Sequence, residues 1–198
     1  MTIRNLTRIF GPQRVAVVGA SDVPGKVGYI LLHNLVGHGY RGVVYPVNRK
    51  REAVQGIAAH PSLTALPHTP DLAVLCTPAA TVLDLVDECG RLGVMGVIII
   101  SAGFREVGTV GKLLEARVRE VAARYPGLRI LGPNCLGIMV PSIGLNASFA
   151  ASMVQNGRVA FVSQSGAVCS SVLDWSRASG FGFSHFVSVG NMLDVAID

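Results

Sequence analysis

The sequence predicts an α/β protein built on a doubly wound parallel sheet. Short, almost continuous apolar runs alternate with amphipathic helical segments, the pattern of parallel strands that are covered on both faces. The first run, residues 15–18, leads into the turn Gly19-Ala20-Ser21, and a helix-like segment follows at residues 26–38. A strand, a glycine turn and a helix in this order indicate a Rossmann-like opening.

Four further apolar runs complete the predicted sheet. Each is bounded by turn residues, and we expect the strands at residues 42–47, 72–76, 94–101 and 129–131. Apolar residues recur at helical spacing between 82 and 92 and again between 110 and 121, and Pro126-Gly127 ends the second of these helices. The alternation predicts right-handed βα crossovers.

The chain changes character after Asn134. Residues 137–149 contain glycine and predict irregular structure, whereas a strand at residues 158–162, a helix and a strand at residues 183–189 indicate a second α/β unit. We therefore expect domains at residues 1–140 and 141–198. Two strands are too few for an independent sheet, so the second unit either packs on the first or is the start of a larger, truncated domain, which we favour.

The composition fits a globular protein with a sizeable core. Of the 198 residues, 50% are hydrophobic and 15% are charged. The net charge of +5 has one dense basic patch, residues 49–51, which is too short for a nucleic-acid surface and favours small anionic ligands. The N-terminus lacks the apolar core of a signal peptide, no apolar run could span a bilayer, and the four cysteines form no C-x-x-C pair. We expect a cytoplasmic protein with no metal site and with no nucleic-acid or membrane partner.

The first turn lacks the dinucleotide fingerprint G-x-G-x-x-G. Ser21 stands where the second glycine is needed, and Gly25 and Gly28 come too late. The second strand should end in an acidic residue that binds a ribose hydroxyl, but Asn48 and the basic residues 49–51 follow it. Such an end suits a nucleotide that carries an additional phosphate. Coenzyme A (CoA) and NADP are both ligands of this kind.

Ligands of open parallel sheets bind beyond the carboxyl ends of the strands. The five predicted ends are small, polar or glycine-containing, and backbone N–H groups at the helix starts beside them favour phosphates. One such loop would be an ordinary βα connection, but five together favour a ligand site. The candidate residues are Gly19, Ser21, Lys26, Asn48, Lys50, Thr77, Pro78, Ser101, Ala102, Gly103, Phe104, Asn134 and Cys135.

A second candidate site lies at Ser163-Gln164-Ser165-Gly166, which joins a strand to a helix start. Two hydroxyls and a glycine at the positive end of a helix suit a phosphate or a phosphorylated side chain, with Ser163, Ser165 and Gly166 as its residues. An N-cap serine followed by glycine explains the same pattern equally well.

The remaining polar residues predict no catalytic or metal-binding group. The five histidines contain no pair with metal-ligand spacing, and His185 is expected inside a strand. Cys135 could lie near a ligand, but a small buried cysteine is the more usual case. Arg105 and Glu106 are expected to be surface charges of a loop.

In their order along the chain, the strand ends resemble the CoA-binding domain of the NDP-forming acyl-CoA synthetases. The resemblance rests on residues 15–21, Tyr45-Pro46-Val47-Asn48, residues 101–104 and Gly132-Pro133-Asn134-Cys135-Leu136-Gly137, and it continues through residues 145–149, 163–166 and Gly190-Asn191. This family includes ADP-forming acetate–CoA ligase and the α subunit of succinyl-CoA synthetase. The resemblance implies a Rossmann-like CoA-binding domain followed by a flavodoxin-like ligase domain.

The resemblance also implies a reaction and a role for each candidate residue. In this family an acid, CoA and a nucleoside triphosphate give acyl-CoA, nucleoside diphosphate and phosphate, through an acyl phosphate and a phosphohistidine. By position, Gly19, Ser21 and Lys26 would meet the CoA pyrophosphate, and Asn48 and Lys50 the adenosine and its 3′-phosphate. The pantetheine path would be lined by Thr77, Pro78, Ser101, Ala102, Gly103 and Phe104. Asn134 and Cys135 would lie near the thiol, and Ser163, Ser165 and Gly166 would receive the phosphate of the phosphohistidine.

Part of the family's machinery has no counterpart in this sequence. The phosphorylated histidine is expected beyond Asp198, His185 does not occupy its place, and the ATP-grasp part that uses ATP, ADP and Mg²⁺ is absent. We expect the chain to bind CoA and acyl-CoA, to work with the remaining ligase and ATP-grasp parts, and not to complete the reaction alone. The sequence leaves open whether the protein forms a homo-oligomer.

Two alternatives to a ligase remain at this point. Some relatives carry a similar segment as a non-catalytic CoA-sensing region fused to a protein lysine acetyltransferase, and Leu173-Asp174-Trp175 and Phe183-Ser184 occur in that branch as well. The intact Ser165-Gly166 favours the ligase. An NADP-dependent oxidoreductase would explain residues 49–51 but not residues 163–166.

Overall fold

The computed structural model describes residues 4–197, and its central feature is a five-stranded parallel sheet. The strands lie in the order β2 (Val43–Val47), β1 (Arg14–Val18), β5 (Leu72–Leu75), β6 (Gly96–Ile99) and β7 (Arg129–Leu131). The five expected strands and the doubly wound sheet are therefore confirmed. The strand order reverses at β1, which pairs with both β2 and β5, and the crevice at such a reversal is the usual ligand position.

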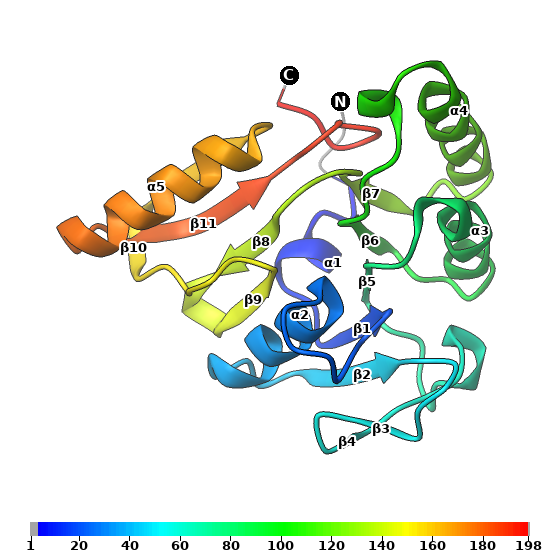
Figure 1. Cartoon of the computed structure of the whole chain (residues 1–198), viewed down its shortest axis with the longest axis horizontal. Helices are drawn as coiled ribbons and strands as arrows, with labels where there is room; N and C mark the ends of the chain where they lie inside the picture. The colour runs from blue at the N-terminus through cyan, green and yellow to red at the C-terminus, as the bar shows by residue number, and fades with distance from the viewer. Residues whose placement is uncertain (1–3, 198) are drawn as a thin grey trace.

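Helices cover both faces of this sheet (Figure 1). The long helices α3 (Val82–Arg91) and α4 (Thr109–Ala123) lie on one face, and α2 (Val27–Gly37) and the short α1 (Thr7–Phe10) lie on the other. The side chains of β1 alternate accordingly: Val15 and Val17 pack in the cluster that contains α2, and Ala16 and Val18 in the cluster that contains α3. Burial on both faces explains why these strands are almost continuously apolar.

A second sheet of four strands follows, in the order β10 (Asn156–Ser163), β11 (Phe183–Ser188), β8 (Gly137–Val140) and β9 (Leu145–Ser148). β10 and β11 are parallel and joined by α5 (Gly166–Ser179), whereas β8 and β9 form an antiparallel hairpin. Our expectation of irregular structure at residues 137–149 was wrong. Gly137 has a φ of +106°, and a Cβ there would overlap the carbonyl oxygen of Ala147, so this glycine permits close strand pairing rather than a loop.

The hairpin supplies the two strands that the second unit needed to form a sheet. The division that we expected after residue 140 falls between β8 and β9, which pair with each other in one sheet.

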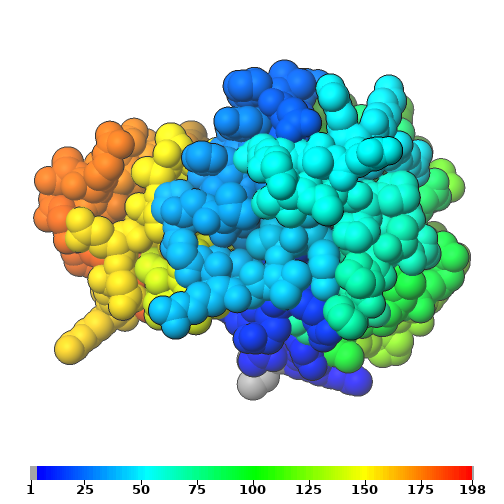
Figure 2. Space-filling model, turned by 90° about the horizontal axis from the view of Figure 1, so that it is seen from below, coloured from blue at the N-terminus to red at the C-terminus, as the bar shows by residue number. Residues whose placement is uncertain are grey.

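The two sheets are tied together at two places. On one side, the Asn34 side chain of α2 donates hydrogen bonds to the carbonyl oxygens of Ser148 and Ala150, both at 2.9 Å. On the other, the chain returns after β11 to the edge of the first sheet, where Leu193 N–H donates to Gly132 at 2.9 Å. In Figure 2 the residues of α5, drawn in orange, lie at one end of the molecule, and β10 is an edge strand of the second sheet.

Short elements complete the described chain. β3 (Ala53–Val54) and β4 (Ile57–Ala58) form a small hairpin, and single 3₁₀ turns lie at η1 (Leu63–Ala65), η2 (Ala79–Thr81), η3 (Arg105–Val107) and η4 (Pro141–Ile143). Among residues 4–197, no helix has the length and apolar character that a bilayer crossing requires.

Candidate functional site

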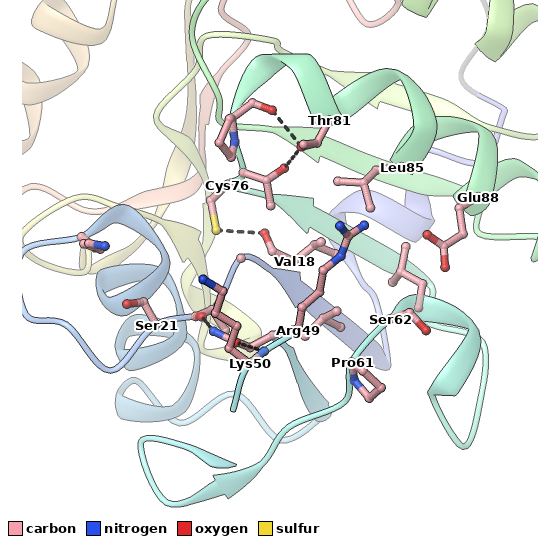
Figure 3. A pocket seen from close by; sticks show the side chains of 18 residues that line it. Val18, Ser21, Arg49, Lys50, Pro61, Ser62, Cys76, Thr81, Leu85 and Glu88 are labelled. Atoms are coloured by element: carbon pink, nitrogen blue, oxygen red, sulfur yellow. Dashed lines mark hydrogen bonds between the residues drawn. The ribbon is translucent and has the colours of Figure 1, made fainter. Parts of the chain in front are cut away.

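A cavity of about 520 Å³ lies at the carboxyl ends of β2, β1 and β5, where the strand order reverses. Its wall contains the turn after β1, the loop after β2, the end of β5 and one side of α3 (Figure 3). Of the candidate residues, this cavity brings together Gly19, Ser21, Lys26, Asn48, Lys50, Thr77 and Pro78. The size falls in the range of small-ligand sites.

The turn after β1 brings the start of α2 close to the strand. Gly19 has a φ of +96°, and its N–H donates to the Val47 carbonyl at 3.1 Å. Gly28, the second residue of α2, lies so close that a Cβ there would overlap the Gly19 carbonyl oxygen. Gly28 thus provides the close helix–strand packing that the third glycine of a dinucleotide fingerprint provides. Sequence spacing alone had predicted no such role for Gly28.

Asn48 ties together the loops after β1 and β2. Its Nδ2 donates to the Ala20 carbonyl at 2.8 Å, and its Oδ1 accepts from the Lys50 N–H at 2.8 Å. Both polar atoms of the side chain therefore have a protein partner. Asn48 lines the cavity, and its principal contribution is to fix the positions of the residues around it.

Three basic side chains line the cavity: Lys26, Arg49 and Lys50. In Figure 3 the Arg49 guanidinium reaches toward Leu85 and Glu88, whereas Lys50 extends toward the Ser21 side. Arg49 and Lys50 thus place their charged groups at different ends of the same cavity. The predicted site omitted Arg49, although its place in the basic run after the second strand was the available signal.

A second cavity, of about 670 Å³, continues from the first, because Cys76, Thr77 and Pro78 line both. It adds the candidate residues Ser101, Ala102, Asn134 and Cys135 and also Gly166 at the start of α5. The Ser101 hydroxyl donates to the Thr77 carbonyl at 2.5 Å and so joins the ends of β5 and β6. The two cavities form one groove from the basic loop after β2 to the first turn of α5.

Two cysteines on the groove are held as neutral thiols. Burial raises the pKa of Cys76 to about 12, and it likewise raises the pKa of Cys135 to about 12. The thiolate is the nucleophilic form of cysteine. At neutral pH neither residue is therefore an activated nucleophile, and both act as small lining groups.

Four candidate residues lie off the groove walls. We expected Phe104 to line the ligand path, but its side chain is fully buried in the core cluster that contains α3. Gly103 precedes it in the same turn with a φ of +108°. Ser163 and Ser165 lie just before α5, where Ser165 Oγ accepts from Val168 N–H at 3.2 Å as the N-cap.

A group of residues for which the sequence predicted no role lies behind the second cavity. Glu106, which we expected to be a surface charge of a loop, is exposed, and it also accepts hydrogen bonds from the N–H groups of Gly103 and Phe104 at 2.6 and 3.0 Å. Its other oxygen accepts from Asn191, which also donates to the buried Glu115. The two contacts of Asn191 join residues 85 and 76 positions apart, which no local pattern could reveal.

The parallel sheet, its strand-order reversal and the groove beyond it define a domain of the doubly wound α/β class, in which ligands bind at this position. A family model described as a CoA binding domain matches residues 13–141, and one described as a succinyl-CoA ligase like flavodoxin domain matches residues 156–198. The chain belongs to the CoA binding domain family.

Similar curated proteins are acid–CoA ligases. An ADP-forming acetate–CoA ligase I of Archaeoglobus fulgidus is 46% identical over 96% of this chain and 27% of its own length. The α subunit of an ADP-forming acetate–CoA ligase II of Pyrococcus furiosus is 45% identical over 96% of this chain and 41% of its own length. The chain thus spans between a quarter and two fifths of these relatives.

Solved structures agree with this placement. A crystal structure of a Pyrococcus horikoshii protein matches with a TM-score of 0.93 and 45% identity over 97% of this chain and 43% of that one. A dinucleotide-forming acetyl-coenzyme A synthetase 1 of Candidatus Korarchaeum cryptofilum, in complex with phosphate and ADP, matches with a TM-score of 0.92 and 39% identity over 97% of this chain and 41% of that one.

Proposed function

We propose that this chain is the CoA-binding part of an ADP-forming acid–CoA ligase. The reaction is acid, CoA and nucleoside triphosphate to acyl-CoA, nucleoside diphosphate and phosphate. The observation that carries the proposal is the continuous groove, which is basic at one end and reaches an asparagine, a cysteine and a helix start at the other. A long nucleotide with a thiol arm matches that sequence of surfaces better than a dinucleotide does, because no acidic residue follows β2 directly.

The first cavity fits the nucleotide end of CoA. The turn from Gly19 to Ser21 and the side chain of Lys26 lie beside the start of α2, where the helix dipole favours a pyrophosphate. Arg49 and Lys50 supply positive charge for the remaining phosphate. Leu63 and Leu85 offer an apolar surface to the adenine.

The second cavity fits the arm. Thr77, Pro78, Ser101 and Ala102 line it with small side chains, and Asn134 and Cys135 line the part that the first cavity does not share. In this arrangement the chain binds and orients CoA so that the thiol reaches the region in front of α5. Acyl transfer then takes place between the two sheets.

The start of α5 is the proposed phosphate position. α5 has 14 residues, Gly166 is its first and lines the second cavity, and Ser165 caps it. The Ser165 hydroxyl accepts the Val168 N–H, so its own proton stays available for a phosphate oxygen. Ser163, Ser165 and Gly166 would thus hold inorganic phosphate or a phosphohistidine brought by another part of the ligase, which would also use ATP and Mg²⁺.

Calorimetric titration of the chain with CoA, dephospho-CoA, NADP and NAD in parallel tests the proposal. We expect micromolar binding of CoA, about −8 kcal/mol, and at least tenfold weaker binding of NADP and NAD. Equal or tighter binding of NADP would contradict it. Joined to the remaining ligase parts, the chain should support ATP-dependent formation of acyl-CoA. A CoA-sensing module would bind CoA but show no such activity.

A further inference from the structure

Asn191 lies between two carboxylates in the turn that follows β11. It is 6% exposed, and its Nδ2 donates to Glu106 Oε2 at 2.8 Å and to Glu115 Oε2 at 2.9 Å. Glu115 is itself buried, with Arg105 and Arg119 each 3.8 Å from its other oxygen. One amide group therefore bridges two acidic side chains from η3 and α4.

The carboxylates fix which way the Asn191 amide faces. An ionised carboxylate only accepts hydrogen bonds, so the NH₂ group of Asn191 must point toward Glu106 and Glu115. Partial burial acts to raise the pKa of Glu106, but hydrogen bonds from Asn191 and from the N–H groups of Phe104 and Gly103 outweigh it, and the pKa is lowered. The Glu106 side chain is thus an acceptor at neutral pH.

The fixed amide of Asn191 in turn fixes that of Asn134. Asn191 Oδ1 accepts a long hydrogen bond of 3.4 Å from Asn134 Nδ2. The opposite orientation of Asn134 would set two amide oxygens against each other. The backbone holds Asn134 in place as well, because its N–H donates to the Ser101 carbonyl at 3.0 Å and its φ is +56°.

In the Asn134 side chain, Nδ2 therefore already donates a hydrogen bond, whereas Oδ1 accepts none within the described residues. Asn134 is exposed on the wall of the second cavity. The same Glu106 that orients Asn191 also holds the turn after β6 through Gly103. The turns after β6, β7 and β11 thus share one hydrogen-bonded network behind the cavity.

We infer that Asn191 is a positioning residue for the CoA arm, which orients Asn134 so that its Oδ1 accepts a hydrogen bond from an N–H or S–H donor at the end of that arm. The inference rests on the proposed function, because it requires the arm to occupy the second cavity. Asn191 itself does not touch the ligand. Its effect reaches the arm only through Asn134.

The test uses two variants of the network and one matched control. Asn191→Leu removes the bridging amide and keeps the same branched arrangement of side-chain heavy atoms. Glu106→Gln keeps one acceptor for the Gly103 and Phe104 N–H groups but turns a donor toward Asn191. Glu120→Gln makes the same chemical change at an exposed position on α4, away from the network.

Three ligands separate the arm from the nucleotide: CoA, desulfo-CoA and 3′-phosphoadenosine 5′-diphosphate, which lacks the arm. We expect both network variants to weaken CoA binding about fivefold, the usual effect of one hydrogen bond, while binding of the diphosphate changes little. Thermal unfolding shows that each variant is folded at the temperature of the titration. If the donor is the S–H group, the wild type binds CoA more tightly than desulfo-CoA, and the variants lose that preference. If the donor is an N–H group, the variants bind CoA and desulfo-CoA with equally reduced affinity.

A double-mutant cycle separates positioning from general structural loss. In an Asn134→Ala background, Asn191→Leu should leave CoA affinity unchanged, because the group through which it acts is gone. Equal losses for CoA and the diphosphate, unchanged CoA binding, or additive effects of the two substitutions would each overturn the inference. If the wild type binds the diphosphate and CoA equally, the inference alone fails. If it binds neither, the proposed function fails too.

Discussion

The side-chain amide of Asn48 donates a hydrogen bond of 2.8 Å to the backbone carbonyl of Ala20, which joins the loops after two neighbouring strands. The same side chain accepts from the Lys50 N–H. The turn that faces the proposed pyrophosphate and the loop that carries the basic side chains are therefore held by one residue. The shape of the first cavity depends on it.

Replacement of this amide should loosen both loops. We expect Asn48→Ala to weaken CoA binding about five- to tenfold, because an ordered pair of loops becomes mobile and its hydrogen bonds, each worth about 1 kcal/mol, are lost. Calorimetric titration measures the affinity, and thermal unfolding shows whether the fold is retained. Wild-type affinity in a folded Asn48→Ala variant would remove this role.

Gly28 should be far less tolerant of substitution than another glycine of the same helix. A Cβ at Gly28 would overlap the Gly19 carbonyl, whereas a Cβ at Gly37 would meet open space. We expect Gly28→Ala to lower the free energy of unfolding by about 1–3 kcal/mol and to weaken CoA binding, because α2 must move away from the turn. Gly37→Ala should be neutral or stabilising by up to about 1 kcal/mol. Similar urea midpoints for the two variants would contradict the close packing.

The basic loop should distinguish CoA from dephospho-CoA. Arg49 and Lys50 line the first cavity, so the double variant Arg49→Gln/Lys50→Gln should bind the two ligands equally, and Lys50→Gln should lose part of the preference. The wild-type preference should shrink as salt concentration rises. Lys112→Gln removes one charge at an exposed position on α4 and is the matched control for Lys50→Gln. A double variant that keeps the full preference would place the 3′-phosphate elsewhere.

The buried thiols should make the fold less stable in alkaline solution. The pKa of Cys135 is raised by burial from its ordinary value of 9.0 to about 12, so between these values the unfolded chain loses a proton that the folded chain keeps. The free energy of unfolding should therefore fall as pH rises above 9, by at most about 1.4 kcal/mol per pH unit for each such thiol. Urea unfolding between pH 8 and 10 measures the slope, which should be smaller in Cys135→Ala. An unchanged slope in that variant would show that Cys135 ionises equally in both states.

The parts of the fold that follow from local pattern were predictable. The five strands of the first sheet are apolar because helices cover both faces, and each apolar run indicates that burial directly. The helix starts at the strand ends, and with them most of the groove, follow from the same alternation. The CoA-binding family then followed from the ordered set of strand-end residues, which the family match confirms.

Features that depend on contacts between distant residues were not predictable. Gly137 signals a loop in the sequence, yet it pairs with Ser148 in a hairpin and lies against the Ala147 carbonyl oxygen. Phe104 adjoins small residues of the groove wall, but its large ring is stabilised in the core instead. The bridge from Asn191 to Glu106 exists only because the chain returns from the second sheet to the first.

A crystal structure of the chain with bound CoA tests the proposed CoA site most directly. We expect the adenosine end between the loops after β1 and β2, the arm past Thr77 and Pro78, and the thiol end beside Asn134. An empty groove in the presence of saturating CoA, or CoA bound at another surface, would contradict the proposed site.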